Sequence, residues 1–99
     1  MVFEISKVSG IGEYTSKTET VDEKERTLYF KDEKVFLVVN KNTIEFRTDE
    51  ELKKLLTEKY ESVMESRYFG RGGVEVVVAG HQLSDDELFD LVRLSYNLS

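Results

Sequence analysis

The chain has 99 residues, of which 39% are hydrophobic and 34% charged, and it has no cysteine. This length supports one domain with a single modest core, and the lack of cysteine excludes disulfides, a thiolate nucleophile and cysteine-ligated metals. The net charge of −6 opposes general attraction to phosphate backbones. No apolar run or basic leader suits a membrane span or a signal peptide, so we expect one soluble, cytoplasmic domain over residues 1–99, without membrane association.

The first predicted elements are a lead-in and an edge strand. Over about residues 1–12, the apolar positions fit neither the helical nor the strand period, so we expect a short helix or an irregular segment. Residues 13–21 are rich in Thr and Tyr, which suit a strand, but have little to bury. They predict an exposed edge strand in which Lys17 and Glu19 are the charges that blunt such edges.

An antiparallel meander is predicted next, because turns this short cannot form parallel crossovers. The predicted strands occupy residues 26–30, 35–40 and 43–47, and the turns that precede them occupy residues 22–25, 31–34 and 40–42. The last strand alternates, with Ile44 and Phe46 on one face. Glu45 and Arg47 occupy the other face.

A capping box at residues 48–51 predicts the start of a helix, with the Thr48 hydroxyl as the cap and Glu51 reaching back to it. Apolar residues then follow helical spacing over three turns, which predicts a core-facing stripe. These residues are Leu52, Leu55, Leu56, Tyr60, Val63 and Met64.

The remaining chain predicts a strand at 74–80, with Val74, Val76 and Val78 on one face, and a second capping box at 84–87. That box opens a closing helix with the apolar residues Leu88, Leu91, Val92 and Tyr96. The order of strands, helix, strands and helix predicts an α+β fold. We expect a two-layer domain in which helices pack on an antiparallel sheet of about five strands.

The segment Ser-Arg-Tyr-Phe-Gly-Arg-Gly-Gly at 66–73 combines arginines, aromatics and glycines. It is neither a Walker loop nor a dinucleotide-binding loop, because a strand rather than a helix follows it. We expect a short strand and a turn, with Tyr68 and Phe69 serving the sheet and the core.

Catalysis has little support in the sequence. His81, the only histidine, could act as a base with Asp85 or Asp86, but a histidine in a turn beside a helix start is typical of a solvated loop residue. No nucleophile elbow and no metal-ligand spacing is present. We therefore expect no enzyme, no cofactor and no metal site.

Nucleic-acid binding is the leading functional hypothesis. Lysines at hairpin tips can touch phosphates, and arginines beside aromatic rings can bind single strands. The candidate residues are Lys31, Lys34, Lys41, Arg67, Tyr68 and Arg71. The alternative is structural, since hairpin lysines are ordinary solubilising residues and Tyr68 or Phe69 can belong to the core.

The chain resembles the MmcQ/YjbR family over roughly residues 10–98. The resemblance rests on three segments, which are 29–39, 44–56 and 83–98. The last of them ends in a Ser-Tyr-x-Leu motif at Ser95, Tyr96 and Leu98. The resemblance implies a compact α+β fold known as a double wing, similar in arrangement to secretion chaperones, and it implies DNA binding by analogy of fold.

The chain differs from this family in two places. Fewer residues precede Gly12 than the family's N-terminal helix requires, and the chain has no tryptophan where the family carries a Lys-x-x-Trp-like element before the late strand. The element order is also similar to the TfoX N-terminal domain. The functional hypotheses are therefore a non-enzymatic module that binds DNA or RNA, and a protein-interaction or homodimerisation domain that uses the edge strand or the face bearing Val77.

Overall fold

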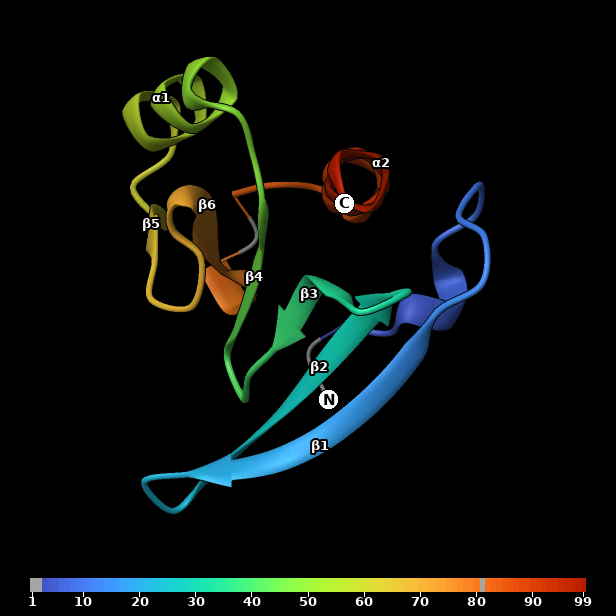
Figure 1. The fold of residues 1–99 in the computed structure, drawn as a ribbon. Helices are drawn as coiled ribbons and strands as arrows, with labels where there is room; N and C mark the ends of the chain where they lie inside the picture. Colours follow the sequence, from blue (N-terminus) through green and yellow to red (C-terminus); the bar gives the residue numbers. More distant parts are fainter. Residues whose placement is uncertain (1–2, 81) are drawn as a thin grey trace.

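Within residues 3–80 and 82–99, which the computed structural model describes, six strands form one antiparallel sheet (Figure 1). The strands are β1 (Thr15–Val21), β2 (Lys24–Lys31), β3 (Lys34–Val39), β4 (Thr43–Arg47), β5 (Val63–Ser66) and β6 (Gly70–Val77). Their order across the sheet is β1-β2-β3-β4-β6-β5, and every neighbouring pair is antiparallel. The predicted α+β class is confirmed, and the sheet has six strands rather than about five.

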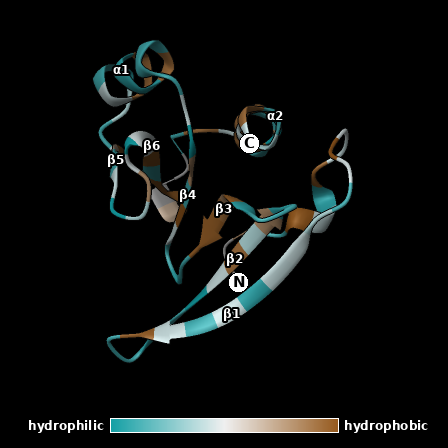
Figure 2. Cartoon of the chain, viewed as in Figure 1, coloured by the Kyte–Doolittle hydropathy of each residue, from teal (hydrophilic) through white to brown (hydrophobic). Residues whose placement is uncertain are grey.

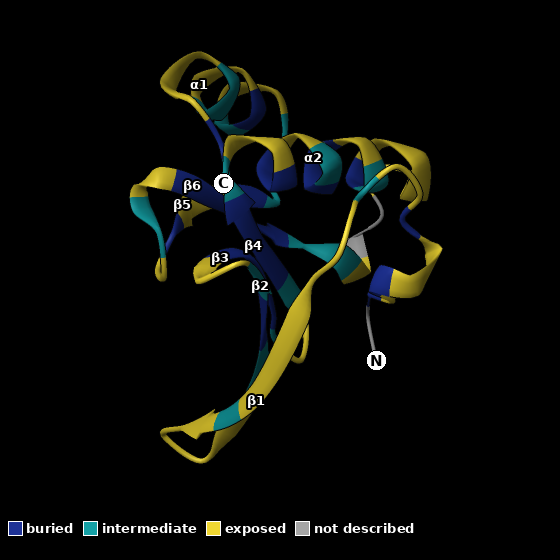
Figure 3. Ribbon diagram, turned by 45° about the vertical axis from the view of Figure 1, so that its right-hand side comes forward, coloured by how far each residue is buried: buried dark blue, intermediate teal, exposed yellow. Residues whose placement is uncertain are grey.

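The helices α1 (Glu50–Lys59) and α2 (Asp85–Leu98) cover one face of the sheet (Figure 3). The helix α1 lies over β5 and β6, and α2 lies over β3 and β4. Two short 3-10 helices, η1 (Ile5–Lys7) and η2 (Val78–Gly80), complete the described elements. The core lies between this inner face and the helices, because β3, β4, β6 and α2 supply most of the fully buried apolar side chains.

The predicted stripe of the first helix is wrong beyond its third turn. The helix ends at Lys59, and the next residues form β5, where Val63 pairs with Val76 on β6. A β-branched valine in a half-buried pleated position favours the strand. Leu55, predicted to face the core, is 64% exposed, so only part of the apolar pattern reports burial.

Helix capping agrees with the prediction at one helix and differs at the other. The cap of α1 is Asp49, whose Oδ1 accepts a hydrogen bond from the Leu52 amide at 2.7 Å. Thr48 is buried instead, and its amide donates to the Gly72 carbonyl. Ser84 caps α2 in a capping box, as predicted.

Two features explain the continuous burial of β3, a β-bulge and a second apolar cluster that buries its outward-facing residues Val35 and Val38. Tyr29 pairs with Leu37, but the next residue Phe30 pairs with Val35, so Phe36 is an extra residue on β3. The bulge turns both Phe36 and Leu37 toward the inner face, where each is 0% exposed. The expected alternation of a half-buried strand is therefore absent from β3.

Ser95 and Tyr96 attach α2 to the sheet. The Ser95 hydroxyl donates to the Phe36 carbonyl at 2.6 Å and accepts from the Arg47 amide at 2.7 Å. The Tyr96 hydroxyl donates to the Glu13 carbonyl at 2.9 Å, and its ring packs edge-on against Phe36. Two residues of the Ser-Tyr-x-Leu motif, Ser95 and Tyr96, therefore have a structural role, because they join α2 to the sheet.

The hairpin of β1 and β2 extends away from the rest of the domain (Figure 3). Its turn has only two residues, Asp22 and Glu23, and both have positive φ angles, of 51° and 67°. This is the pattern of a type I′ turn, whose twist matches that of the strands. The predicted edge strand is confirmed, and the strands run closer to the tip than the sequence indicated.

Candidate functional site

The six candidate residues do not form one surface. Lys31 ends β2 and Lys34 begins β3, which places both at the end of the sheet where Arg67, Tyr68 and Arg71 also lie. The strand β4 separates β2 and β3, which carry the two lysines, from β6 and the turn that precedes it. Lys41 lies in the turn between β3 and β4, at the opposite end of the sheet.

Lys31 has a structural contact. Its Nζ donates to the Tyr96 carbonyl at 3.2 Å and lies 4.7 Å from the centre of the Tyr96 ring. A cation at the C-terminal turn of α2 is favoured by the helix dipole. Lys34 and Lys41 are exposed, and the turn between Lys31 and Lys34 carries the acidic residues Asp32 and Glu33, so this tip has no net positive charge.

Two glutamates are buried on the outer face, the face of the sheet opposite the helices. Glu45 on β4 pairs directly with Glu75 on β6, and each is only 2% exposed. Buried carboxylates are costly unless they are hydrogen-bonded. The sequence placed Glu45 on this face correctly but gave no sign that it is covered.

The turn that follows β5 covers Glu45. The Oε1 atom of Glu45 accepts hydrogen bonds from the Ser66 hydroxyl at 2.8 Å and from the Tyr68 amide at 2.9 Å. Its Oε2 accepts from the Asn40 side chain at 2.8 Å. The Ser66 hydroxyl also accepts from the Phe69 amide at 2.9 Å. The carboxylate therefore organises the segment 66–69.

Glu75 is held by Arg67. The Nε and one terminal nitrogen of Arg67 donate to the two carboxylate oxygens at 2.9 and 2.7 Å, and the Thr43 hydroxyl donates at 2.8 Å. Burial alone raises the pKa of Glu75, but these hydrogen bonds and the charge of Arg67 together lower it below its usual value. The same carboxylate raises the pKa of Arg67. Arg67 is thus a partner of a buried group, although its own side chain is 74% exposed.

Tyr68 and Phe69 lie between arginines on the outer face. Their rings meet edge-to-face at 4.9 Å. The guanidinium of Arg26 lies 5.3 Å from the Tyr68 ring, and that of Arg47 lies 5.0 Å from the Phe69 ring. A small second apolar cluster lies beneath Phe69, made by Leu28, Val35 and Val38 with Phe30 at its margin. The rings pack on the sheet as predicted, but both residues lie in the turn between β5 and β6 rather than in a strand. Neither ring belongs to the main core between the sheet and the helices.

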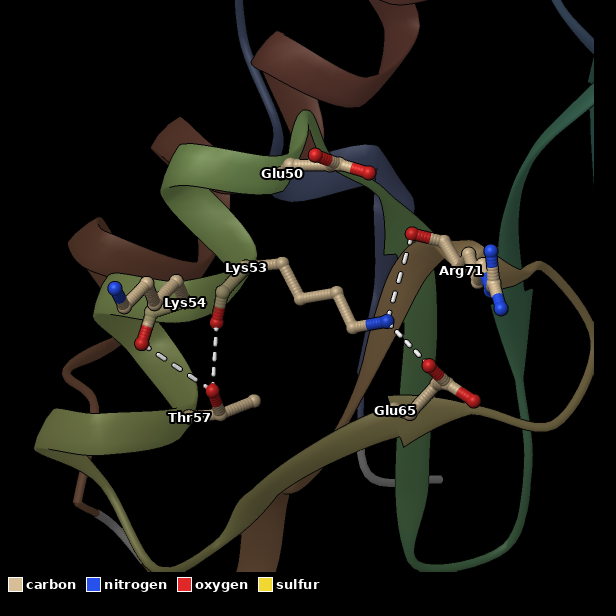
Figure 4. Close-up of a pocket in the computed structure, with 6 residues that line it drawn as sticks. All are labelled: Glu50, Lys53, Lys54, Thr57, Glu65 and Arg71. Carbon is tan, nitrogen blue, oxygen red and sulfur yellow. Dashed lines mark hydrogen bonds and ion pairs between the residues drawn. The ribbon is translucent and has the colours of Figure 1, made fainter.

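Arg71 lines a shallow hollow beside α1 (Figure 4). Within this hollow, Lys53 points across from the helix and binds both the Glu65 carboxylate and the Arg71 carbonyl. The hydrogen bond from Lys53 to Glu65 and the positive charge of Lys53 lower the pKa of Glu65. The lining carries charges of both signs, and Lys53 already has an acidic partner, so the hollow is a poor anion site.

Of the two edge strands of the described sheet, β1 is the longer, with seven residues against four in β5. Every residue of β1 is exposed except Glu19, which is half-buried. Figure 2 shows β1 mostly in pale and hydrophilic colours, in contrast to the hydrophobic β3. Glu19 forms an ion pair with Arg26 at 3.3 Å, and the hydroxyls of Thr18 and Thr27 meet at 3.2 Å.

The sequence predictions on catalysis, metal binding and membrane association concern other features of the chain. His81, the candidate catalytic base, lies outside the described residues. Over residues 3–80 and 82–99, no cluster of acidic or histidine side chains is arranged to hold a metal ion. No helix in this part of the chain is long and apolar enough to cross a membrane.

Comparisons with protein-family models, curated proteins and solved structures found no match. The sequence missed the paired carboxylates Glu45 and Glu75, because glutamate on the outer face of a strand normally indicates solvent. One feature of the sequence could have indicated this pair. Two strands each carry a single glutamate among apolar residues, which are isoleucine and phenylalanine in one strand and valines in the other.

Proposed function

We propose that this chain is a non-enzymatic binding module that takes up an extended polypeptide segment along the free edge of β1. The observation that carries the proposal is a seven-residue strand, Thr15–Val21, with a partner on one side only and almost no buried side chain. Such an edge offers a row of backbone donors and acceptors, which a partner strand can complete by β-augmentation.

The other edge of the sheet is less suited to this role. The strand β5 has four residues and a register shift between Glu65 and Ser66. The ion pair between Lys53 and Glu65 ties it to α1. A partner strand would find fewer backbone groups there, and they are less regular.

The non-enzymatic part of the proposal rests on the state of the charged groups. Glu45 and Glu75 are the only acidic side chains buried among the described residues, and each is fully engaged with donors of the fold. A carboxylate that acts as a general base must reach a substrate proton. The segment 66–69 and Arg67 occupy that position instead.

The proposal is tested with a displayed library of random seven-residue peptides selected on the wild-type protein. Selected peptides should be rich in strand-forming residues, and their binding should shift the backbone amide resonances of β1 in an NMR titration. A double variant Ser16→Pro/Thr20→Pro removes two backbone donors from the edge and should abolish binding. Peptides that perturb another surface, or that bind the double variant equally well, would overturn the proposal.

Nucleic-acid binding is a second candidate, favoured by the arginines that surround Tyr68 and Phe69. Arg26, Arg47 and Arg67 lie on the same face as these rings, and stacking with phosphate neutralisation is the usual mode for single strands. Against it, all three guanidiniums have partners within the fold. The net charge is −6.

A titration with single- and double-stranded DNA and RNA at several salt concentrations tests this candidate. Phosphate-driven binding is greatest at low salt and weakens as salt rises. The variant Arg67→Ala/Arg71→Ala should weaken binding and reduce the salt slope. No binding at low salt would overturn this candidate, because phosphate-driven affinity is greatest there. Binding that persists with an unchanged slope in the variant would exclude Arg67 and Arg71 from it.

Membership of the MmcQ/YjbR-like family is part of the proposal. The strand pair at 29–39, the strand that leads into α1 at 44–56 and the closing helix at 83–98 support it, because these elements follow one another as the resemblance requires. The roles of Ser95 and Tyr96 in joining α2 to the sheet also support it. An experimental structure of a family member that lacked these two contacts would argue against it.

A further inference from the structure

The sequence of β1 is charge-complementary to itself when read in the opposite direction. The strand has seven residues, and Thr18 is its midpoint. In an antiparallel pair centred on Thr18, Lys17 lies opposite Glu19 of the partner subunit, and Glu19 lies opposite Lys17 of the partner subunit. Opposite charges in directly opposed positions stabilise antiparallel strands.

The neighbouring registers lack this complementarity. A two-fold axis between antiparallel strands must pass through a pair of equivalent residues. Centring the pair on Lys17 opposes two lysines, and centring it on Glu19 opposes two glutamates. Like charges in opposed positions destabilise a sheet. The register centred on Thr18 is also the one in which all seven residues of each strand are paired.

Side-chain contacts between β1 and β2 of each chain would continue across the pair of β1 strands. On the outer face, Glu19 already binds Arg26 of β2, so Lys17 of the partner subunit would give it a second cation on its free side. On the inner face, the hydroxyl pair of Thr18 and Thr27 would continue through Thr18 of the partner subunit. Threonine pairs across strands add hydrogen bonds of their own.

We infer that two copies of this chain pair antiparallel through β1, centred on Thr18, and join their sheets into one. This inference rests on the proposed function, because it names the occupant of the β1 edge as a second copy. Charges normally blunt an edge strand by repelling a like strand. Here the two charges are one residue either side of the midpoint and of opposite sign, so they select one register instead.

The interface is small, because it consists of one strand from each subunit. Interfaces below about 1,200 Å² belong to transient complexes, so the dimer is a concentration-dependent one. Its exposed ion pairs are also screened by salt. The expected behaviour is a monomer–dimer equilibrium that shifts toward monomer as salt rises.

Two charge variants test the register. Lys17→Glu makes the edge wholly acidic, and Glu19→Lys makes it wholly basic. Each variant alone should raise the dimer dissociation constant at least about tenfold in sedimentation velocity. An equimolar mixture of the two should restore association, because each acidic residue of one variant then lies opposite a basic residue of the other. Lys34→Glu makes the same charge change as Lys17→Glu away from β1, and it should leave the equilibrium unchanged.

Hydrogen exchange gives a second measurement on the wild-type protein. The outward-facing amides of Thr15–Val21 should become protected as protein concentration rises, whereas amides in β5 should not change. Circular dichroism establishes that each variant is folded before its association is measured.

Three results would overturn the inference. These are a wild-type protein that stays monomeric up to millimolar concentration, a dimer that persists unchanged in both charge variants, and a mixture that fails to associate. A monomeric protein whose β1 still binds the selected peptides would leave the proposed function standing. A protein that neither associates nor binds peptides at β1 would remove both.

Discussion

At one edge of the sheet, the turn between β5 and β6 folds back over the outer face, where Ser66 and Tyr68 bind the buried Glu45. At the other edge, β1 and its turn lie in solvent. Both hairpins carry charged residues, but the first uses them to fix a covered turn and the second presents them along a free backbone. The role of a charged strand residue therefore depends on which other parts of the chain cover it.

Among the variants that test these two hairpins, Glu45→Ala should destabilise the protein most. The substitution removes the acceptor of the Ser66 hydroxyl and the Tyr68 amide, and buried donors without acceptors are expensive. We expect a loss of about 2–4 kcal/mol in the free energy of unfolding. Chemical denaturation measures it, with the exposed Glu61→Ala as the control. A loss in Glu45→Ala no larger than that in the control would mean that the turn does not depend on the carboxylate.

A pair of glycine variants tests how closely the chain packs at the covered edge. A Cβ at Gly73 would lie 2.5 Å from the Phe46 carbonyl oxygen and 2.9 Å from the Phe69 side chain. Gly73→Ala should therefore destabilise the protein by about 1–3 kcal/mol. A Cβ at the adjacent Gly72 would lie 3.6 Å from the Phe69 carbonyl, an ordinary contact. Gly72→Ala should be nearly neutral in thermal unfolding, and equal effects of the two variants would contradict the packing described.

Acid should lower the free energy of unfolding through Glu75, the buried carboxylate that Arg67 holds. The folded state lowers the pKa of Glu75 from its ordinary value of 4.5, so ionisation contributes stability above that value. This contribution is lost as the pH falls through 4.5 toward the folded pKa. Glu75→Gln cannot lose it, so its free energy of unfolding should fall less between neutral pH and about pH 3 than that of the wild type. Parallel pH profiles for the two proteins would show that the ion pair with Arg67 adds no such dependence.

The smallest effect is expected at the free edge. Glu19→Gln breaks the ion pair with Arg26, but both side chains are partly exposed, at 30% and 27%. The loss should be about 0–1 kcal/mol, well below that of Glu45→Ala in the same denaturation assay. Dilute protein is needed for this measurement, so that association does not contribute. A large loss in dilute protein would mean that the β1–β2 hairpin depends on this pair more than its exposure indicates.

Much of the fold could be predicted from the sequence, because local signals fix its elements. Ser84 and Glu87 formed the capping box that they predict, and the alternation of Ile44 and Phe46 reports the inner face correctly. The apolar residues of α2 are buried as their spacing predicts. These signals act within a few residues and need no knowledge of distant contacts.

The errors have tertiary causes. Val63 continues a helical spacing by coincidence and pairs with Val76 instead. Thr48 satisfies the pattern of a cap, but Asp49 takes that role while the Thr48 amide binds Gly72. The candidate site was affected in the same way, because the pairing of Arg67 with Glu75 depends on a hairpin register that no local pattern specifies.

The opposed glutamates have a consequence for how the chain finds its register. A slip of one residue between β4 and β6 would turn a carboxylate from the outer face toward the apolar interior, since side chains alternate along a strand. It would also leave Ser66 and Arg67 without their acceptors. Misaligned pairings are thus penalised at the centre of the sheet, where valines alone would tolerate several alignments. The carboxylate pair discriminates against incorrect folds as well as stabilising the native one.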